Sequence, residues 1–159
     1  MKKIIDCITF FDENMLLDFR LNVLNDYVDF FVIVEAKEDH QGNQKKLNFN
    51  IENYKKYKHK IIYLVQEKIV IDENIKLPKN WAIDHLRDQS QRNYISRALN
   101  KFDEDDWIII SDLDEIPNPN VIFKFNPINK FSVFKQKLFY YKFNLVSKNS
   151  FWYGSRIVV

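Results

Sequence analysis

The run of residues 107–111 constrains the fold more than any other stretch of the chain. A tryptophan and three isoleucines follow four acidic residues and lead directly into Ser-Asp-Leu-Asp-Glu-Ile-Pro. This pattern predicts a short strand buried on both faces, and Pro117 prevents its simple continuation. The carboxylates of Asp112, Asp114 and Glu115 are therefore expected at the end of a buried strand.

Acidic residues at that position favour a cation site. In open α/β sheets, ligands bind outside the carboxyl ends of the strands, and residues i and i+2 of an extended chain point the same way. Asp112 and Asp114 would then converge on one hard cation that holds a diphosphate. The alternative is a solvated turn, because the Asp-x-Asp pattern also occurs by chance. Residues 103–105 form a second Asp-x-Asp, with no apolar strand before it.

The rest of the chain alternates predicted strands and helices, which indicates a three-layer α/β/α sandwich with a mostly parallel central sheet. Its last, aromatic strands could run antiparallel. Asp12 is the expected N-cap of the first helix. The predicted elements are strands at 4–11, 30–34, 61–65 and 107–111, helices at about 12–27 and 82–102, a short helix at 121–125, and a half-exposed strand at 139–145.

Glu35, His40, Arg20 and Arg92 are further candidates for the same site. Glu35 ends the second strand, and His40 lies in the polar loop after it, where it binds a substrate hydroxyl or phosphate or is a plain surface residue. Arg20 borders the apolar stripe of the first helix, which suggests an ion pair with Asp6 or Glu13, or else a ligand contact.

Arg92 lies where the apolar face of the second helix turns polar. It would project into a cleft, or form a surface ion pair with Asp88 one turn away.

Composition narrows the function classes. A single domain spanning residues 1–159 is the expected organisation for this length, and a net charge of +2 gives no argument for a nucleic-acid partner. The only two glycines, Gly42 and Gly154, exclude a glycine-rich phosphate loop. Cys7 is the sole cysteine, and no apolar segment reads as a signal peptide or membrane span, so we expect a cytoplasmic location.

Four separate motifs together resemble glycosyltransferase family 17. They are Asp6-Cys7-x-x-Phe10-Phe11-x-Glu13 with Leu17, Arg20 and Leu21; Val32-Ile33-Val34-Glu35-Ala36 followed by His40-x-Gly42; Gln91-Arg92-Asn93; and Ile110-Ser111-Asp112-Leu113-Asp114-Glu115-Ile116-Pro117. The resemblance implies a GT-A fold, a UDP-sugar donor, expected to be UDP-N-acetylglucosamine, a glycan acceptor, and Mn²⁺ or Mg²⁺. It also implies that such a domain continues past Val159, so we expect the C-terminal part to be missing.

The resemblance also suggests roles for particular residues. Asp114 would bind the metal directly, and Asp112 would lie nearer the ribose or a metal-bound water. Arg92 would neutralise the diphosphate. Glu115 is a candidate catalytic residue, and the base that activates the acceptor is otherwise unassigned.

Glu13, Arg20 and Glu35 match family positions and are grouped with the donor site, as is His40. Two other functions remain open. One is a non-catalytic module that binds a nucleotide sugar or a glycan. The other is a nucleotidyltransferase with a similar sheet, which would release pyrophosphate rather than UDP.

Overall fold

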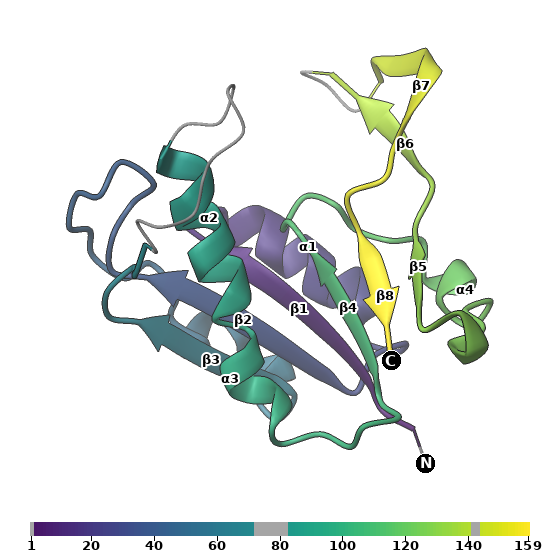
Figure 1. Cartoon of the computed structure of the whole chain (residues 1–159), viewed down its shortest axis with the longest axis horizontal. Helices are drawn as coiled ribbons and strands as arrows, with labels where there is room; N and C mark the ends of the chain where they lie inside the picture. Colours follow the sequence, from purple (N-terminus) through teal and green to yellow (C-terminus); the bar gives the residue numbers. More distant parts are fainter. Residues whose placement is uncertain (1, 72–82, 141–143) are drawn as a thin grey trace.

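The computed structural model describes residues 2–71, 83–140 and 144–159 and shows an α/β protein built on one mixed sheet (Figure 1). The sheet order is β3-β2-β1-β4-β8-β5, with β1 parallel to β2 and β4, β2 parallel to β3, and β8 antiparallel to β4 and β5. Its strands are β1 Ile4–Phe10, β2 Phe30–Ala36, β3 Ile61–Gln66, β4 Trp107–Ser111, β5 Phe131–Val133 and β8 Arg156–Val158. The predicted mostly parallel sheet is confirmed, and the strands after β4 pair in antiparallel fashion, as expected for the aromatic C-terminal segment.

Helices cover both faces of this sheet, and a separate hairpin extends from one end (Figure 1). The hairpin consists of β6 Gln136–Phe139 and β7 Val146–Trp152. The helices are α1 Asn14–Leu24, α2 Ile83–Asn93, α3 Ser96–Leu99 and α4 Pro119–Ile122, with 3₁₀ turns η1 Ile51–Tyr57 and η2 Pro127–Asn129. No helix in the described ranges combines the length and apolar character that a membrane span requires.

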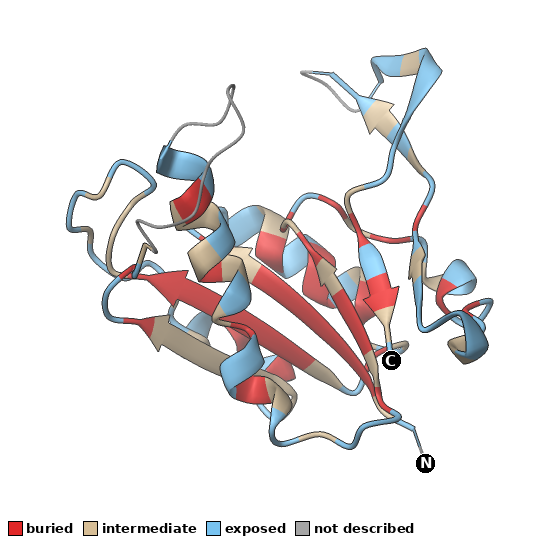
Figure 2. Cartoon of the chain, in the orientation of Figure 1, coloured by how far each residue is buried: buried red, intermediate tan, exposed pale blue. Residues whose placement is uncertain are grey.

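Each central strand contributes alternate side chains to two cores, which appear as the red strands of Figure 2. Ile8 and Phe10 point towards α1 and pack with its Leu17 and Leu21, whereas Cys7 points towards the face covered by α3. Because both faces are covered, the central strands are apolar in continuous runs rather than in alternation. Burial also raises the pKa of the Cys7 thiol well above its usual range.

Three predicted elements differ from the structure. The helix expected at 82–102 is interrupted after Asn93, where Ile95 N–H bonds to the Arg92 carbonyl in an i→i−3 contact before α3 begins. Its expected start at residue 82 lies outside the described residues. Of the strand expected at 139–145, Phe139 ends β6, and the Tyr140 N–H bonds to the Leu145 carbonyl just before β7 begins; residues 141–143 are outside the described ranges.

The third difference concerns the start of α1. The N-cap is Glu13 rather than Asp12, and it makes no side-chain bond to the helix. Its carboxylate turns back and accepts hydrogen bonds from the backbone N–H groups of Phe11 (3.2 Å) and Asp12 (3.1 Å). The acidic residue thus stabilises the loop that leaves β1.

The buried stripe of α1 gives a first prediction. Leu21 has no exposed surface, so Leu21→Ala leaves a cavity and should lower the free energy of unfolding by about 2–5 kcal/mol. Phe19→Ala on the same helix removes a side chain that is 57% exposed and should change it by less than about 0.5 kcal/mol. Urea unfolding followed by circular dichroism measures both, and equal losses would contradict this packing.

Candidate active site

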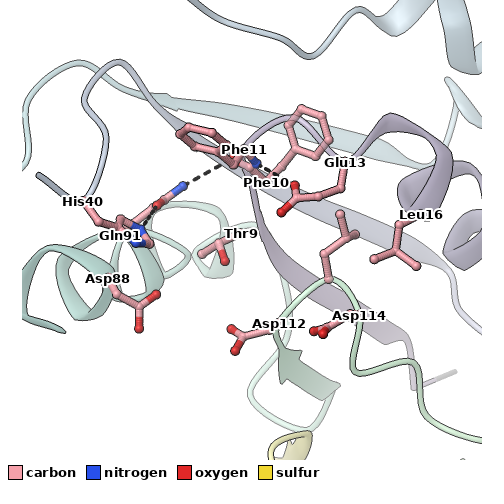
Figure 3. Close-up of a pocket in the computed structure, with 11 residues that line it drawn as sticks. Thr9, Phe10, Phe11, Glu13, Leu16, His40, Asp88, Gln91, Asp112 and Asp114 are labelled. Atoms are coloured by element: carbon pink, nitrogen blue, oxygen red, sulfur yellow. Dashed lines mark hydrogen bonds between the residues drawn. The ribbon is translucent and has the colours of Figure 1, made fainter. Parts of the chain in front are cut away.

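A cavity of about 390 Å³ lies at the carboxyl ends of the parallel strands, between the loops that leave β1 and β4. The chain leaves β1 towards β2 on one side and later returns to β4 on the other, so this is the point where strand order reverses. Ligands of open α/β sheets bind at such points. The lining residues of this switch-point cavity are Thr9, Phe10, Phe11, Glu13, Leu16, His40, Asp88, Gln91, Asp112, Leu113 and Asp114 (Figure 3).

The described lining of the switch-point cavity is strongly acidic. Glu13, Asp88, Asp112 and Asp114 contribute four carboxylates, and no lysine or arginine is among the lining residues that the structure describes. Burial raises the pKa of Asp112; its neighbours Glu115, Asp88 and Asp114 raise it further, while the Arg92 guanidinium opposes the shift. An anionic ligand would therefore meet repulsion here unless a cation accompanied it.

Arg92 lies beside this acidic group. Its Nη2 donates to Asp112 Oδ1 at 2.7 Å and to Asp88 Oδ2 at 3.1 Å. The Asp88–Arg92 pair, one of the two arrangements considered for Arg92 from the sequence, is confirmed, and the same guanidinium also reaches Asp112 at the end of β4. Arg92 does not itself line the cavity. One arginine thus links α2 to the Asp-x-Asp turn.

The turn itself differs from the extended geometry expected at 112–114. β4 ends at Ser111, and the Glu115 N–H bonds to the Asp112 carbonyl at 3.1 Å, which closes a tight turn. Both aspartates nevertheless border the cavity, Asp114 as an exposed residue and Asp112 as a partly buried one. They come together through the turn rather than through strand periodicity.

Arg20 holds this turn from inside the protein. It is fully buried, and its Nε and Nη2 bind both oxygens of the buried Asp6 carboxylate, at 2.8 and 2.7 Å. The guanidinium also donates to the carbonyls of Asp112 (2.9 Å) and Leu113 (3.2 Å) and to Ser111 Oγ (2.6 Å). The ion pair with Asp6, one of the two partners expected, is confirmed, and Arg20 does not line the cavity.

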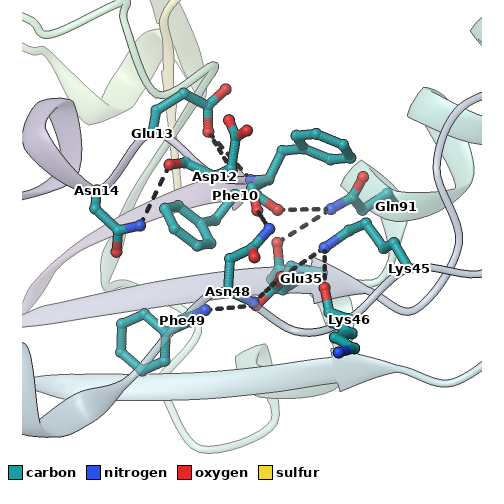
Figure 4. Close-up of polar contacts among 12 residues, drawn as sticks. Phe10, Asp12, Glu13, Asn14, Glu35, Lys45, Lys46, Asn48, Phe49 and Gln91 are labelled. Atoms are coloured by element: carbon teal, nitrogen blue, oxygen red, sulfur yellow. Dashed lines mark hydrogen bonds and ion pairs between the residues drawn. The ribbon is translucent and has the colours of Figure 1, made fainter.

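Glu35 is likewise an internal residue. Its carboxylate accepts hydrogen bonds from Lys45 Nζ (2.6 Å), Tyr63 Oη (2.8 Å) and the N–H groups of Asn48 (2.7 Å) and Phe49 (3.1 Å), part of which Figure 4 shows. The pKa of Tyr63 is raised, mainly because the side chain is buried and secondly because its hydroxyl donates to Glu35. Although Glu35 was grouped with the donor site, it ties the loop after β2 to the sheet, because its side chain is on the buried α1 face.

His40 and Gln91 form the remaining wall. Gln91 Nε2 donates to the carbonyls of Val34 (3.2 Å) and Phe10 (3.5 Å), and its Oε1 lies 3.4 Å from His40 Nε2 (Figure 3). Gln91 therefore joins the ends of β1 and β2 to the His40 loop. Sequence reasoning gave it no role, although a glutamine on the sheet-facing side of a helix, beside Arg92, was the available signal.

A second cavity, of about 400 Å³, shares Asp112 and Asp114 with the first. Its other lining residues come from Glu115 and the β6–β7 hairpin, and we call it the hairpin cavity: Asp112, Asp114, Glu115, Gln136, Lys137, Leu138, Phe139 and Trp152. Glu115 borders this cavity and not the first. The Asp-x-Asp turn thus separates two adjoining spaces.

The fold and this site define an α/β protein with an acidic cavity at the switch point of its sheet. The family model of glycosyltransferase family 17 matches residues 1–158. The chain therefore belongs to glycosyltransferase family 17.

Curated relatives agree with this assignment. The chain is 31% identical over 121 residues to the β-1,4-mannosyl-glycoprotein 4-β-N-acetylglucosaminyltransferases of Rattus norvegicus, Homo sapiens and Mus musculus. Each match covers 73% of this chain but 22% of the relative, so the similarity spans about a fifth of those proteins. No solved structure matches significantly.

The buried ion pair gives a second prediction. Arg20→Met leaves Asp6 charged and unpaired in the core and should lower the free energy of unfolding by about 3–5 kcal/mol. The double variant Asp6→Leu/Arg20→Met should be more stable than Arg20→Met alone, because no buried charge remains.

Urea unfolding of the wild type, both single variants and the double variant gives the coupling energy. Arg97→Met, at an exposed arginine, is the matched control and should change stability by less than about 0.5 kcal/mol. Losses that simply add in the double variant would contradict a buried pair.

Proposed function

We propose that this chain carries the donor site of a GT-A-type glycosyltransferase, which transfers N-acetylglucosamine from UDP-N-acetylglucosamine to a glycan hydroxyl. The observation that carries the proposal is the switch-point cavity, which Asp112 and Asp114 line and where Asp112 binds Arg92. Membership of glycosyltransferase family 17 and the names of the relatives support the sugar.

The residues at this edge of the sheet fit a divalent cation that is held partly by the protein and partly by its substrate. Among the described residues no group of three His, Cys, Asp or Glu side chains could hold a metal. A metal held by protein ligands alone does not fit, whereas Mg²⁺ or Mn²⁺ commonly takes one or two carboxylates and completes its shell with substrate phosphate and water. Asp112 and Asp114 would supply those carboxylates, with the diphosphate as the missing ligand.

Such a cation would stabilise the negative charge of the departing UDP. Arg92 binds Asp112 at this place and would assist by binding a phosphate oxygen. Gln91 and His40 would define the adjoining wall for the nucleotide, and Arg20 would hold the turn in place from beneath.

A non-catalytic module that binds nucleotide sugar or glycan is the second candidate function. It is favoured by the hairpin cavity, where the exposed rings of Phe139 and Trp152 lie beside polar side chains. Release of UDP from UDP-N-acetylglucosamine, by hydrolysis or transfer, would exclude it.

The metal role of the turn gives a third prediction. Asp114→Ala should reduce UDP affinity in the presence of Mn²⁺ to the level measured with EDTA, because the cation loses its exposed carboxylate. Isothermal titration calorimetry with UDP measures this.

Asp105→Ala is the matched control, since Asp105 belongs to the second Asp-x-Asp and is exposed. It should bind UDP and Mn²⁺ as the wild type does. Unchanged binding by Asp114→Ala would refute the assignment of this turn.

The diphosphate role of Arg92 gives a fourth prediction. Arg92→Met should weaken UDP binding about tenfold, the equivalent of losing one charge-assisted contact. Uridine, which has no phosphate, should bind wild type and variant within about twofold of each other, because no charge-assisted contact is involved. Equal losses for both ligands, by the same calorimetric titration, would instead indicate that Arg92 only shapes the cavity.

A further inference from the structure

We propose that the hairpin cavity is a saccharide-binding subsite, in which the indole ring of Trp152 stacks on one sugar ring of the acceptor. The proposal rests on the proposed function and extends it to the second substrate. Its starting point is that this cavity and the switch-point cavity share Asp112 and Asp114. A ligand in the hairpin cavity would lie directly beside whatever those two carboxylates bind.

The indole ring is held in a fixed position. Trp152 Nε1–H donates a hydrogen bond to Glu115 Oε1, while Glu115 Oε2 accepts from the Asp112 N–H at 3.1 Å. A single buried carboxylate therefore connects the tryptophan to the Asp-x-Asp turn. At Gly154 an added Cβ would overlap both the Glu115 carboxylate and the indole nitrogen, so a glycine is needed at this point of close approach.

The ring is also accessible. Trp152 is 46% exposed and Phe139 is 44% exposed, and both line the cavity. A large aromatic side chain that is anchored at its polar end and open on its side loses little conformational entropy when a ligand packs against it. These features are typical of a binding surface rather than of core packing.

The polar groups select a sugar over an apolar occupant. Gln136, Lys137 and Glu115 line the cavity together with the two aromatic rings. An apolar peptide side chain or lipid chain would desolvate the exposed Lys137 ammonium and Asp114 carboxylate without giving either a partner, which is costly. A pyranose ring presents C–H groups on its faces and hydroxyl donors at its edge, and so matches both kinds of wall.

The hairpin that carries this surface is tied to the site by further bonds. Ser155 Oγ lies 2.7 Å from the Glu115 carbonyl and 2.9 Å from Gln136 Oε1 and donates its single hydrogen to one of these two oxygens. Gln136 Nε2 donates to the Ile116 carbonyl at 3.0 Å. The segment directly after the Asp-x-Asp thus fixes the base of the hairpin. This network therefore sets the position of the hairpin cavity relative to the switch-point cavity.

The test is an NMR titration of the ¹⁵N-labelled full chain with β-1,4-mannobiose and with N,N′-diacetylchitobiose. The chain has three tryptophans, and the spectrum of Trp152→Phe assigns the indole Nε1–H signal of Trp152. At least one disaccharide should shift that signal. Trp152→Ala should weaken binding of the same disaccharide about tenfold, or about 1.4 kcal/mol.

Phe151→Ala is the matched control, because Phe151 is the preceding residue, is 47% exposed and does not line the cavity. It should bind the disaccharide within about twofold of the wild type, since it removes no stacking surface. Trp152→Phe keeps a ring and should bind more tightly than Trp152→Ala, which separates stacking from a loss of fold. Circular dichroism melting checks the fold of each variant.

Three results would overturn the proposal. Neither disaccharide shifts the Trp152 signal; or Trp152→Ala and Phe151→Ala weaken binding equally; or Trp152→Ala weakens UDP binding with Mn²⁺ as much as it weakens saccharide binding. The proposed function fails separately, if Asp114→Ala binds UDP and Mn²⁺ normally. Saccharide binding that depends on Trp152 would then remain as a glycan-binding property alone.

Discussion

The buried ion pair between Arg20 and Asp6 is the interaction on which the candidate site depends. Asp6 lies in β1, between β2 and β4, where an unpaired carboxylate would be strongly destabilising. Arg20 neutralises it and donates its remaining hydrogens to Ser111 and to the carbonyls of Asp112 and Leu113. One guanidinium therefore connects helix α1, the central strand and the Asp-x-Asp turn, so the core and the site cannot be arranged independently.

Negative charges outnumber positive ones around the Asp-x-Asp turn. Four carboxylates line the switch-point cavity, while Arg92 Nη2 is shared between Asp88 and Asp112. Burial and the neighbouring acids both disfavour the charged form of Asp112, as the raised pKa indicates. In the proposed function a divalent cation removes this repulsion, and the diphosphate that accompanies it gives Arg92 a competing partner. Binding of nucleotide and cation would then be coupled, because each compensates the charge of the other.

Much of this architecture could be predicted from the sequence because it depends on local pattern. Apolar β-branched runs located the strands, and helical spacing located the Asp88–Arg92 pair. The break after Asn93, the pairing of Tyr140 with Leu145 and the bonds of Glu35 could not be predicted, since they depend on partners brought together only by folding. Glu35 shows the difficulty: a carboxylate at a strand end has the same sequence pattern whether it faces the ligand rim or, as here, accepts bonds from Lys45 and Tyr63.

The difference between a carboxylate at the rim and one that accepts bonds inside the protein also explains why three acids lie at the end of β4. A strand end that needed only a cation ligand would require one or two carboxylates, and a third would add repulsion. Glu115 is buried and accepts hydrogen bonds from the Asp112 N–H and the Trp152 indole, so its charge is compensated within the protein. Asp114 is exposed, and Asp112 shares Arg92 with Asp88. The three carboxylates therefore divide into two at the rim, assigned in our proposal to the cation, and one that joins this rim to the hairpin. Glu115, considered from the sequence as a catalytic residue, has the contacts of a residue that positions both sides of the site.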